Sequence, residues 1–178
     1  MKNLSKFLLL LLPGLILLWT AGAGMAGYKA REWNAKAREL YAASLSSEGV
    51  TIAAEPLFTD ALAARAFDKK DVVTRGIMPL ALVIFNDNDY PIEVDVESIE
   101  LIRGEERYPA LSPEEAVNRI FGKEKARPGT TTNKVANEEA LKDFSAKYLK
   151  DAMIAPHKSA GGFLYFRIYN PKELQEYL

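Results

Sequence analysis

The chain has 178 residues, and about 130 remain after the apolar leader and the stretch behind it, which suits one domain with a single core. Its formal net charge of −1 gives no overall positive field, so we expect no nucleic-acid partner. The chain contains no cysteine, which excludes disulfides, thiolate catalysis, thiolate metal sites and a lipid-modified cysteine. Because His157 is the only histidine, a histidine-based metal site or a Ser-His-Asp triad would depend on that residue.

A long apolar run opens the chain. Residues 7–27 read FLLLLLPGLILLWTAGAGMAG and follow a short basic start that contains Lys2 and Lys6. The basic start, the apolar stretch and the small residues at 21–23 are typical of a cleavable export signal. The same run is long enough for a helix of about 30 Å, which would span the hydrocarbon core of a bilayer. These residues are compatible with cleavage of the leader and with its retention in the membrane. We expect a retained signal-anchor over residues 1–27, because the length of the apolar run permits one.

The charges around the leader conflict over membrane orientation. Two lysines and the amino terminus precede the run, and a count of cations alone favours a cytoplasmic C-terminal part. A very short tail ahead of an apolar run that ends in small residues is nevertheless how export signals are built. We therefore expect the C-terminal part to be exported. The cations that follow the run closely are Lys29, Arg31, Lys36 and Arg38.

Residues 28–48 have the composition of a helix. They are rich in Ala, Glu, Lys, Arg and Leu and contain neither proline nor glycine, which predicts a helical stalk. Apolar residues recur at three- and four-residue spacings and form a thin stripe. Either this stripe packs on the chain's own domain, or Tyr28 and Trp33 lie near the membrane interface and the stripe contacts a neighbouring subunit.

Residues 49–178 predict one antiparallel β domain, a sandwich with short helices in the connections between strands. The apolar run at 77–85 favours a strand buried on both faces, and the slip of apolar positions near residues 97–98 indicates a bulge or bend. An exposed loop is expected at 122–137. The expected strands are 50–54, 77–85, 92–103, 107–111 and 163–169, and the expected helices are 61–67, 112–122, 138–152 and a last short one from Asn170.

Three stretches carry a resemblance to a known class of domain. They are GIMPLALVI at 76–84, the turn NDNDYP at 86–91, and APHKSAGGFLYF at 155–166. Over about residues 50–169 the chain resembles poorly characterised bacterial exported domains of the immunoglobulin-like β-sandwich type. The resemblance implies a mainly β sandwich outside the cytoplasm and transfers no catalytic residue. Together with the leader, it leads us to expect the domain on the periplasmic side of a bacterial inner membrane. The helical insertions depart from a plain seven-strand sandwich.

Two polar stretches are candidate sites. Asp87 and Asp89 could offer oxygen ligands to calcium, but an EF-hand loop needs glycine and glutamate where Ile92 and Ser98 stand. We therefore expect a hairpin turn whose Asn and Asp side chains bond their own backbone. His157 lies in a polar turn without an evident partner, which favours a surface histidine over a general base. No catalytic, cofactor-binding or metal-binding residue is predicted.

The last predicted strand is rich in aromatic residues. Alternation places Phe163, Tyr165 and Tyr169 on one face, and at least one face of the strand has to be core. If the other face docks elsewhere, Tyr165 and Tyr169 are the residues that contact a partner.

Together these features predict a non-catalytic accessory or structural subunit of a larger bacterial membrane protein complex. Residues 7–27 would contact the bilayer, and the periplasmic domain would contact other membrane-protein subunits. The rival hypothesis is a soluble periplasmic module that binds a small molecule or glycan after signal cleavage. The residues expected to contact partners are Trp19, Gly22, Gly24, Tyr28, Trp33, Tyr165 and Tyr169.

Overall fold

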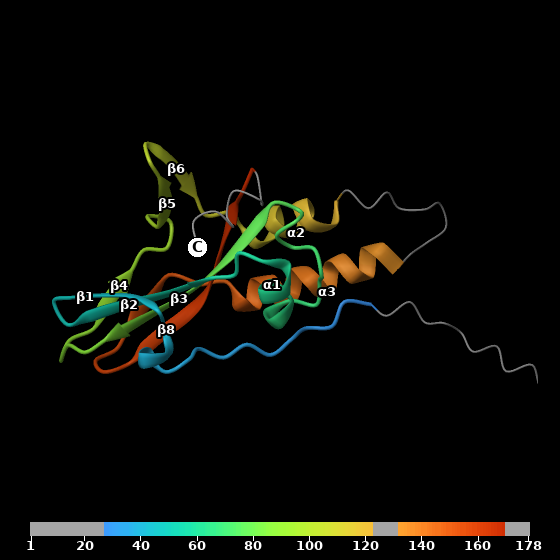
Figure 1. Ribbon diagram of the computed structural model, residues 1–178. Coiled ribbons are helices and arrows are strands. Elements are labelled where there is room, and N and C mark those ends of the chain that lie inside the picture. The colour runs from blue at the N-terminus through green and yellow to red at the C-terminus, as the bar shows by residue number, and fades with distance from the viewer. Residues whose placement is uncertain (1–26, 123–131, 170–178) are drawn as a thin grey trace, which may run out of the picture.

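The computed structural model of the protein describes residues 27–122 and 132–169. Within them the fold is mainly β, with antiparallel sheets and three α-helices (Figure 1), so this part of the fold prediction is confirmed. In chain order the elements are η1 (Arg38–Leu40), β1 (Ala43–Ser47), β2 (Val50–Pro56), α1 (Asp60–Ala66), β3 (Ile77–Asn86), β4 (Ile92–Val94), β5 (Glu100–Arg103), β6 (Glu106–Pro109), α2 (Pro113–Phe121), α3 (Thr132–Lys147), β7 (Ala152–Ile154) and β8 (Ser159–Arg167).

A four-stranded sheet in the order β1-β2-β3-β8 forms the centre of the fold. Strand β3 pairs on both sides and is buried over most of its length, as its continuous apolar run predicts. The β1–β2 connection has only Glu48 and Gly49 between the strands, both with positive φ, the geometry of a type I′ hairpin turn. Gly49 is needed there for a second reason, because a Cβ would collide with the Asn88 side chain.

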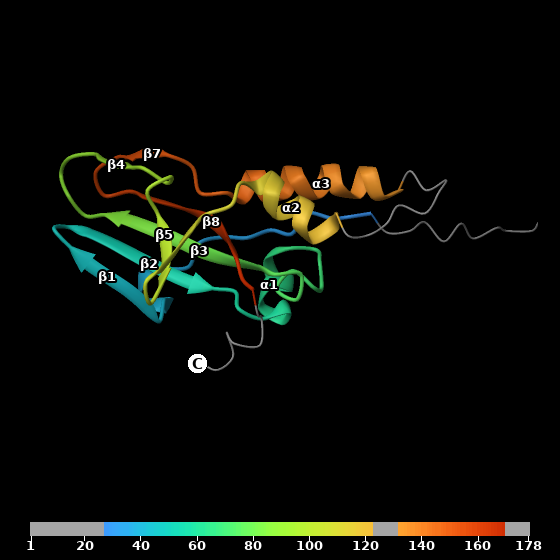
Figure 2. The same ribbon diagram turned by 90° about the horizontal axis from the view of Figure 1, so that it is seen from above.

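Residues of α3 and of the chain after α1 pack on one face of this sheet, and α3 lies beside α2 near one end of it (Figure 2). Phe67, which follows α1, packs its ring 5.1 Å from that of Phe163 on one face. Phe144 of α3 packs 5.1 Å from Tyr165, two residues further along that face. Leu82 of β3 points to the other face, because it follows Ala81, the cross-strand partner of Phe163, and successive side chains of a strand alternate between faces.

The strand predicted over 92–103 is divided in two. Its first part, β4, pairs with β7, and its second part, β5, pairs with β6. Between them Val96 is buried, and its N–H donates to Asp151 Oδ1 at 2.8 Å. The slip in the apolar pattern therefore marks a change of pairing partner: the bend predicted near residues 97–98 is present as a turn, closed by the Ile99 N–H on the Val96 carbonyl, and the alternative of a bulge within one strand is wrong.

The helix predicted over 28–48 is wrong. Apart from the short turn η1, residues 28–42 form no regular secondary structure, and β1 follows. An extended chain advances about 3.3 Å per residue against 1.5 Å in a helix, so its large side chains reach separate parts of the domain. Trp33 packs 4.7 Å from Phe163, and Tyr41 is buried beside Ala53. These tertiary contacts outweigh the helix propensity of the segment.

Helix α3 begins at Thr132, so it includes residues that were predicted as loop. Among residues 27–122 and 132–169, no helix has the length and apolar character that crossing a membrane requires. The leader with Trp19, Gly22 and Gly24, and the short helix predicted from Asn170, lie outside the described residues.

Candidate functional site

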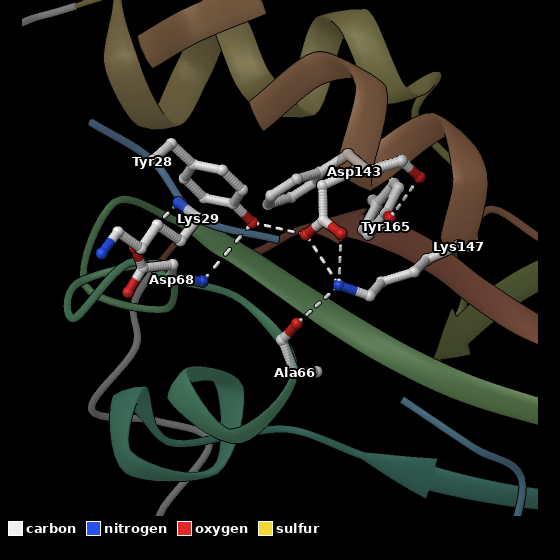
Figure 3. Close-up of polar contacts among 8 residues, drawn as sticks. Tyr28, Lys29, Ala66, Asp68, Asp143, Lys147 and Tyr165 are labelled. Carbon is white, nitrogen blue, oxygen red and sulfur yellow. Dashed lines mark hydrogen bonds and ion pairs between the residues drawn. The ribbon is translucent and has the colours of Figure 1, made fainter. Parts of the chain in front are cut away.

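The segment that follows the leader is joined to the core of the domain by a buried polar network (Figure 3). Tyr28 donates its phenolic hydrogen to Asp143 Oδ2 at 2.6 Å. The Lys147 ammonium donates to the two Asp143 oxygens at 2.6 and 2.7 Å and to the Ala66 carbonyl at 2.8 Å. The side chains of Asp143 and Lys147 are only 5% and 9% exposed. We call these three side chains the Tyr28–Asp143–Lys147 network.

The network forms because Asp143 and Lys147 lie one turn apart on α3, where side chains four residues apart meet. The Lys147 nitrogen also lies 5.1 Å from the centre of the Phe67 ring. Phe144 follows Asp143 on α3, and its carbonyl accepts a hydrogen bond from the Tyr165 hydroxyl at 2.8 Å. Helix α3, the loop after α1 and the N-terminal segment therefore meet at one buried point.

The hydrogen-bond count indicates what this network can do. A lysine ammonium has three donors, and Lys147 has three acceptor oxygens within hydrogen-bond distance. Burial raises the pKa of the Tyr28 phenol, and its hydrogen bond to Asp143 adds to the rise. Burial lowers the pKa of the Lys147 ammonium, against the opposing effect of Asp143. With its polar groups directed at one another, the network is suited to holding segments together.

We expect the domain to lose stability as the pH rises above 10, the ordinary pKa of a tyrosine. Burial raises the pKa of Tyr28, Tyr148 and Tyr165 in the folded state. Their phenols thus ionise first in the unfolded chain, and stabilisation that is complete below pH 10 is lost above it. Lys147 acts in the opposite direction because burial lowers its pKa, whereas the hydrogen bond to Glu106 raises the pKa of Tyr108 and so acts in the same direction as the buried phenols.

Thermal unfolding of the wild type and of Tyr28→Phe, from about pH 8 to about pH 11, checks this expectation. The melting temperature should fall more steeply with pH in the wild type, because the variant lacks one of the three phenols. Equal slopes, or tyrosinate absorbance from Tyr28 in the native protein near pH 10, would contradict it.

A second candidate site is an open cleft of about 790 Å³ between the β5–β6 hairpin and the end of β8. The Tyr108 and Tyr169 rings lie 6.4 Å apart in its lining, and Arg167 lies 4.6 Å from the centre of the Tyr169 ring. Glu106 accepts hydrogen bonds from Arg103 and from Tyr108. Arginines beside aromatic rings suit an anionic or planar group. The cleft is lined by Arg103, Glu106, Arg107, Tyr108, Pro109, Leu111, Arg167 and Tyr169.

The residues predicted to contact partners have different positions in the fold. Tyr165 is fully buried, so the prediction that it contacts a partner is corrected: the interior of the domain takes up both faces of β8 around it. Tyr28 and Trp33 are partly buried against their own domain. Tyr169 is 67% exposed and lies in the cleft, so its partner contact stays a prediction.

The acidic turn after β3 is organised by Asn86. Its amide donates to the carbonyls of Tyr90 and Ile154 at 2.8 and 3.1 Å, and its Oδ1 accepts from the Asn88 N–H at 3.0 Å. The turn and its Asn side chain bonded to nearby backbone are as predicted, but the turn closes no hairpin, because β4 pairs with β7 and not with β3. Asp87 pairs with Arg38, and Asp89 lies 2.9 Å from the exposed His157. In the part of the chain that is described, no group of three or more metal-ligating His, Cys, Asp or Glu side chains occurs.

Sequence reasoning missed the Tyr28–Asp143–Lys147 network. The available signal was an Asp–Lys pair at four-residue spacing beside Ala140 and Phe144, both of which are fully buried. Nothing in the sequence linked that pair to Tyr28, which lies 115 residues earlier. Compared with protein-family models, curated proteins and solved structures, the chain matches none, so its function has to be argued from the geometry of these sites.

Proposed function

We propose that the protein is a non-catalytic accessory subunit of a bacterial membrane protein complex, anchored by residues 7–27 with its domain on the periplasmic side. One observation carries the proposal: Tyr28, the first residue after the apolar run, is already bonded into the domain through Asp143. An anchor joined to the fold without a spacer would hold the domain directly at the bilayer surface.

The contacts of the N-terminal segment indicate which end of the domain would face the membrane. The Tyr28 ring lies 6.1 Å from Phe121 at the end of α2, and the Lys29 N–H donates to Asp68 after α1. The helices lie at this end, whereas the β1–β2 turn lies at the opposite end of the sheet (Figure 1). The helical end would therefore be next to the bilayer, and the sheet would extend away from it toward other subunits.

The cations behind the leader have roles within the domain. Arg31 pairs with Asp68, Lys36 pairs with Glu55, and Arg38 pairs with Asp87. These exposed pairs contribute little stability individually. They give three of the four cations acidic partners within the domain, and such pairs form on either side of a membrane, so the periplasmic orientation that we propose rests on the form of the leader.

The immunoglobulin-like sandwich stays part of this proposal. What supports it is the β4–β7 ribbon, a second antiparallel β element whose Ile154 is buried in the same hydrophobic core as the four-stranded sheet. Two β layers around one core are the basic arrangement of a sandwich.

The proposal predicts that the full chain stays in the membrane and that its complex depends on a short tether. Native membranes should yield the chain with residues 1–27 intact, together with companion subunits, when analysed by mass spectrometry. A flexible Gly-Ser linker inserted between Gly27 and Tyr28 should leave the melting temperature unchanged and reduce recovery of the companions. The matched control carries the same linker after Leu178. A soluble chain that begins near Gly24 would overturn the anchored form.

The soluble binding module remains the second candidate, because the cleft beside Tyr108 and Tyr169 combines aromatic rings with arginines. If a soluble chain were recovered, acidic glycans should raise its melting temperature. Tyr169→Ala should abolish that shift, whereas Met153→Ala, at an exposed position on β7, should not.

A further inference from the structure

The cleft between the β5–β6 hairpin and the end of β8 is positively charged, in a chain whose formal net charge is −1. Its lining carries the arginines Arg103, Arg107 and Arg167 against one acid, Glu106. Arg103 pairs with Glu106, and Arg107 pairs with Glu100 outside the lining. Among the described residues, no carboxylate pairs with Arg167. The cleft therefore contains a guanidinium that a bound anion could pair with.

The Arg167 guanidinium is placed so that its hydrogen-bond donors are available. Its carbon lies 4.6 Å from the centre of the exposed Tyr169 ring. Stacking on a ring engages the flat face of a guanidinium, whereas the N–H groups lie in its plane. Two N–H groups in that plane match the two oxygens of a carboxylate. The Tyr108 ring, 6.4 Å from that of Tyr169, adds a second aromatic surface.

The backbone of Arg167 is also open toward the outer edge of the sheet. The Ile168 N–H donates to the Gly76 carbonyl at 3.1 Å, so the N–H and C=O of the preceding residue point away from β3. Two residues earlier on this outer edge, the Tyr165 carbonyl accepts from the Leu111 N–H at 2.7 Å. Arg167 is the next outward position, and within the described part of the chain no backbone group bonds to it there.

The pairing that covers Tyr165 stops before Arg167 because of a proline. The Leu111–Tyr165 bridge is antiparallel, so the same register would set Pro109 of β6 opposite Arg167. Proline has no N–H and cannot donate to the Arg167 carbonyl. The cleft opens here between the hairpin and the end of β8, which extend in the same direction in Figure 1. One position on the edge of β8 therefore stays open beside an unpaired guanidinium.

We propose that this cleft binds an extended acidic segment of a companion subunit, paired antiparallel with β8 at Arg167. The backbone of the segment would bond the Arg167 N–H and C=O, as in complexes where a peptide adds a strand to a sheet edge. The residue opposite Arg167 would point its side chain to the same face. An Asp or Glu there would meet the guanidinium. A glycan could contact the arginines and rings but has no amide and carbonyl groups in the spacing of a strand.

The position of the cleft suits a companion in the same membrane, and this step rests on the proposed function. The hairpin extends across the long axis of the four-stranded sheet and not from its helical end (Figure 1). If the helical end faces the bilayer, the cleft opens to the side of the domain, where a neighbouring subunit would stand. Neither protein has to be inverted for a segment of the neighbour to reach it.

Binding of defined peptides to the full chain in detergent tests this inference. The probe is a fluorescent peptide with blocked ends and the sequence Val-Glu-Val-Glu-Val, and its control has Gln in place of both Glu. The acidic peptide should bind about tenfold more tightly, because hydrogen bonds between charged groups are the stronger ones. Arg167→Gln should remove this preference. Arg65→Gln, at an exposed position on α1, should keep it.

Methylated peptides test the strand pairing on the unchanged protein. In antiparallel pairing the residue opposite Arg167 donates its N–H to the edge, while its neighbours point theirs away. N-methylation of the Glu residues should therefore weaken binding about tenfold, and N-methylation of the Val residues should weaken it far less. Equal weakening by both would overturn the pairing with β8.

The remaining outcomes separate the occupants and the anchor. No binding, equal affinity for the acidic and Gln peptides, or a preference that survives Arg167→Gln would overturn the site. An oligoglucuronate that binds as tightly would overturn the peptide as occupant. Binding that appears only when Glu173 and Glu176 are both replaced by Gln would assign the cleft to the chain's own acidic residues and overturn the companion. An anchored chain that does not bind refutes only this inference, and a soluble chain that binds refutes only the anchor.

Discussion

Replacing Gly162 with alanine is expected to lower the free energy of unfolding by about 3 kcal/mol or more. A Cβ at this position would lie 2.6 Å from Leu149 N, 2.7 Å from Leu149 Cα and 2.8 Å from the Lys147 carbonyl oxygen. All three are backbone atoms, so no change of side-chain rotamer can relieve the overlap. Either β8 or the chain at the end of α3 would have to move.

That movement would break specific contacts. The Leu149 N–H donates to the Phe163 carbonyl at 3.0 Å, which joins the end of α3 to the edge of the sheet. The Tyr165 hydroxyl donates to the Phe144 carbonyl at 2.8 Å across the same junction. Separation of the two elements would therefore leave buried polar groups without partners, which adds to the steric cost.

Gly161→Ala is the matched control for this prediction. Its Cβ would meet mainly the Val83 side chain, at 3.0 Å, and the Leu82 carbonyl oxygen, at 3.3 Å. A side-chain methyl can move, so a loss of about 1–2 kcal/mol is expected. Urea unfolding of both variants measures the difference. Equal losses would show that the close approach of α3 to β8 at Gly162 is not a tight contact.

Local signals in the sequence predicted the elements that depend on local interactions. Helix α2 begins as its residues indicate, with Ser112 and Glu115 forming a complete capping box. Strand β3 follows from its uninterrupted apolar run, and the turn after it follows from its Asn and Asp residues. In each case the deciding contacts lie within a few residues of one another.

Elements that depend on distant contacts were not predictable in this way. The segment from Tyr28 to Tyr41 has helical composition, but the partners that determine its extended path lie far along the chain, Trp33 packing on Phe163 for example. The predicted strand 92–103 changes partner in its middle: its first part, β4, pairs with β7, roughly sixty residues later in the chain, and only its second part pairs with the next strand, β6. Composition and periodicity carry no information about such pairings.

The second large effect is expected at Asp143. Asp143→Ala removes the counter-charge of Lys147, whose ammonium is buried beside Phe67, and breaking such a pair costs about 3–5 kcal/mol. The variant also leaves the Tyr28 hydroxyl without its acceptor at 2.6 Å. Replacing both charges, as in Asp143→Leu with Lys147→Met, should recover the part of the loss that comes from the unpaired charge, because well-packed apolar residues often substitute for a buried ion pair without cost, while the Tyr28 hydroxyl stays without its acceptor.

Tyr28→Phe tests the attachment of the N-terminal segment without removing the buried ion pair of the core. It removes one hydrogen bond and keeps the Asp143–Lys147 pair, so the loss should be about 1–2 kcal/mol. Urea unfolding of the wild type and of the three variants measures these losses, and limited proteolysis near Lys29 reports release of the segment. If the double variant is as unstable as Asp143→Ala, the pair is not the source of the effect. If Tyr28→Phe leaves proteolysis unchanged, the network does not hold the segment, and the short-tether argument for the membrane-bound domain fails with it.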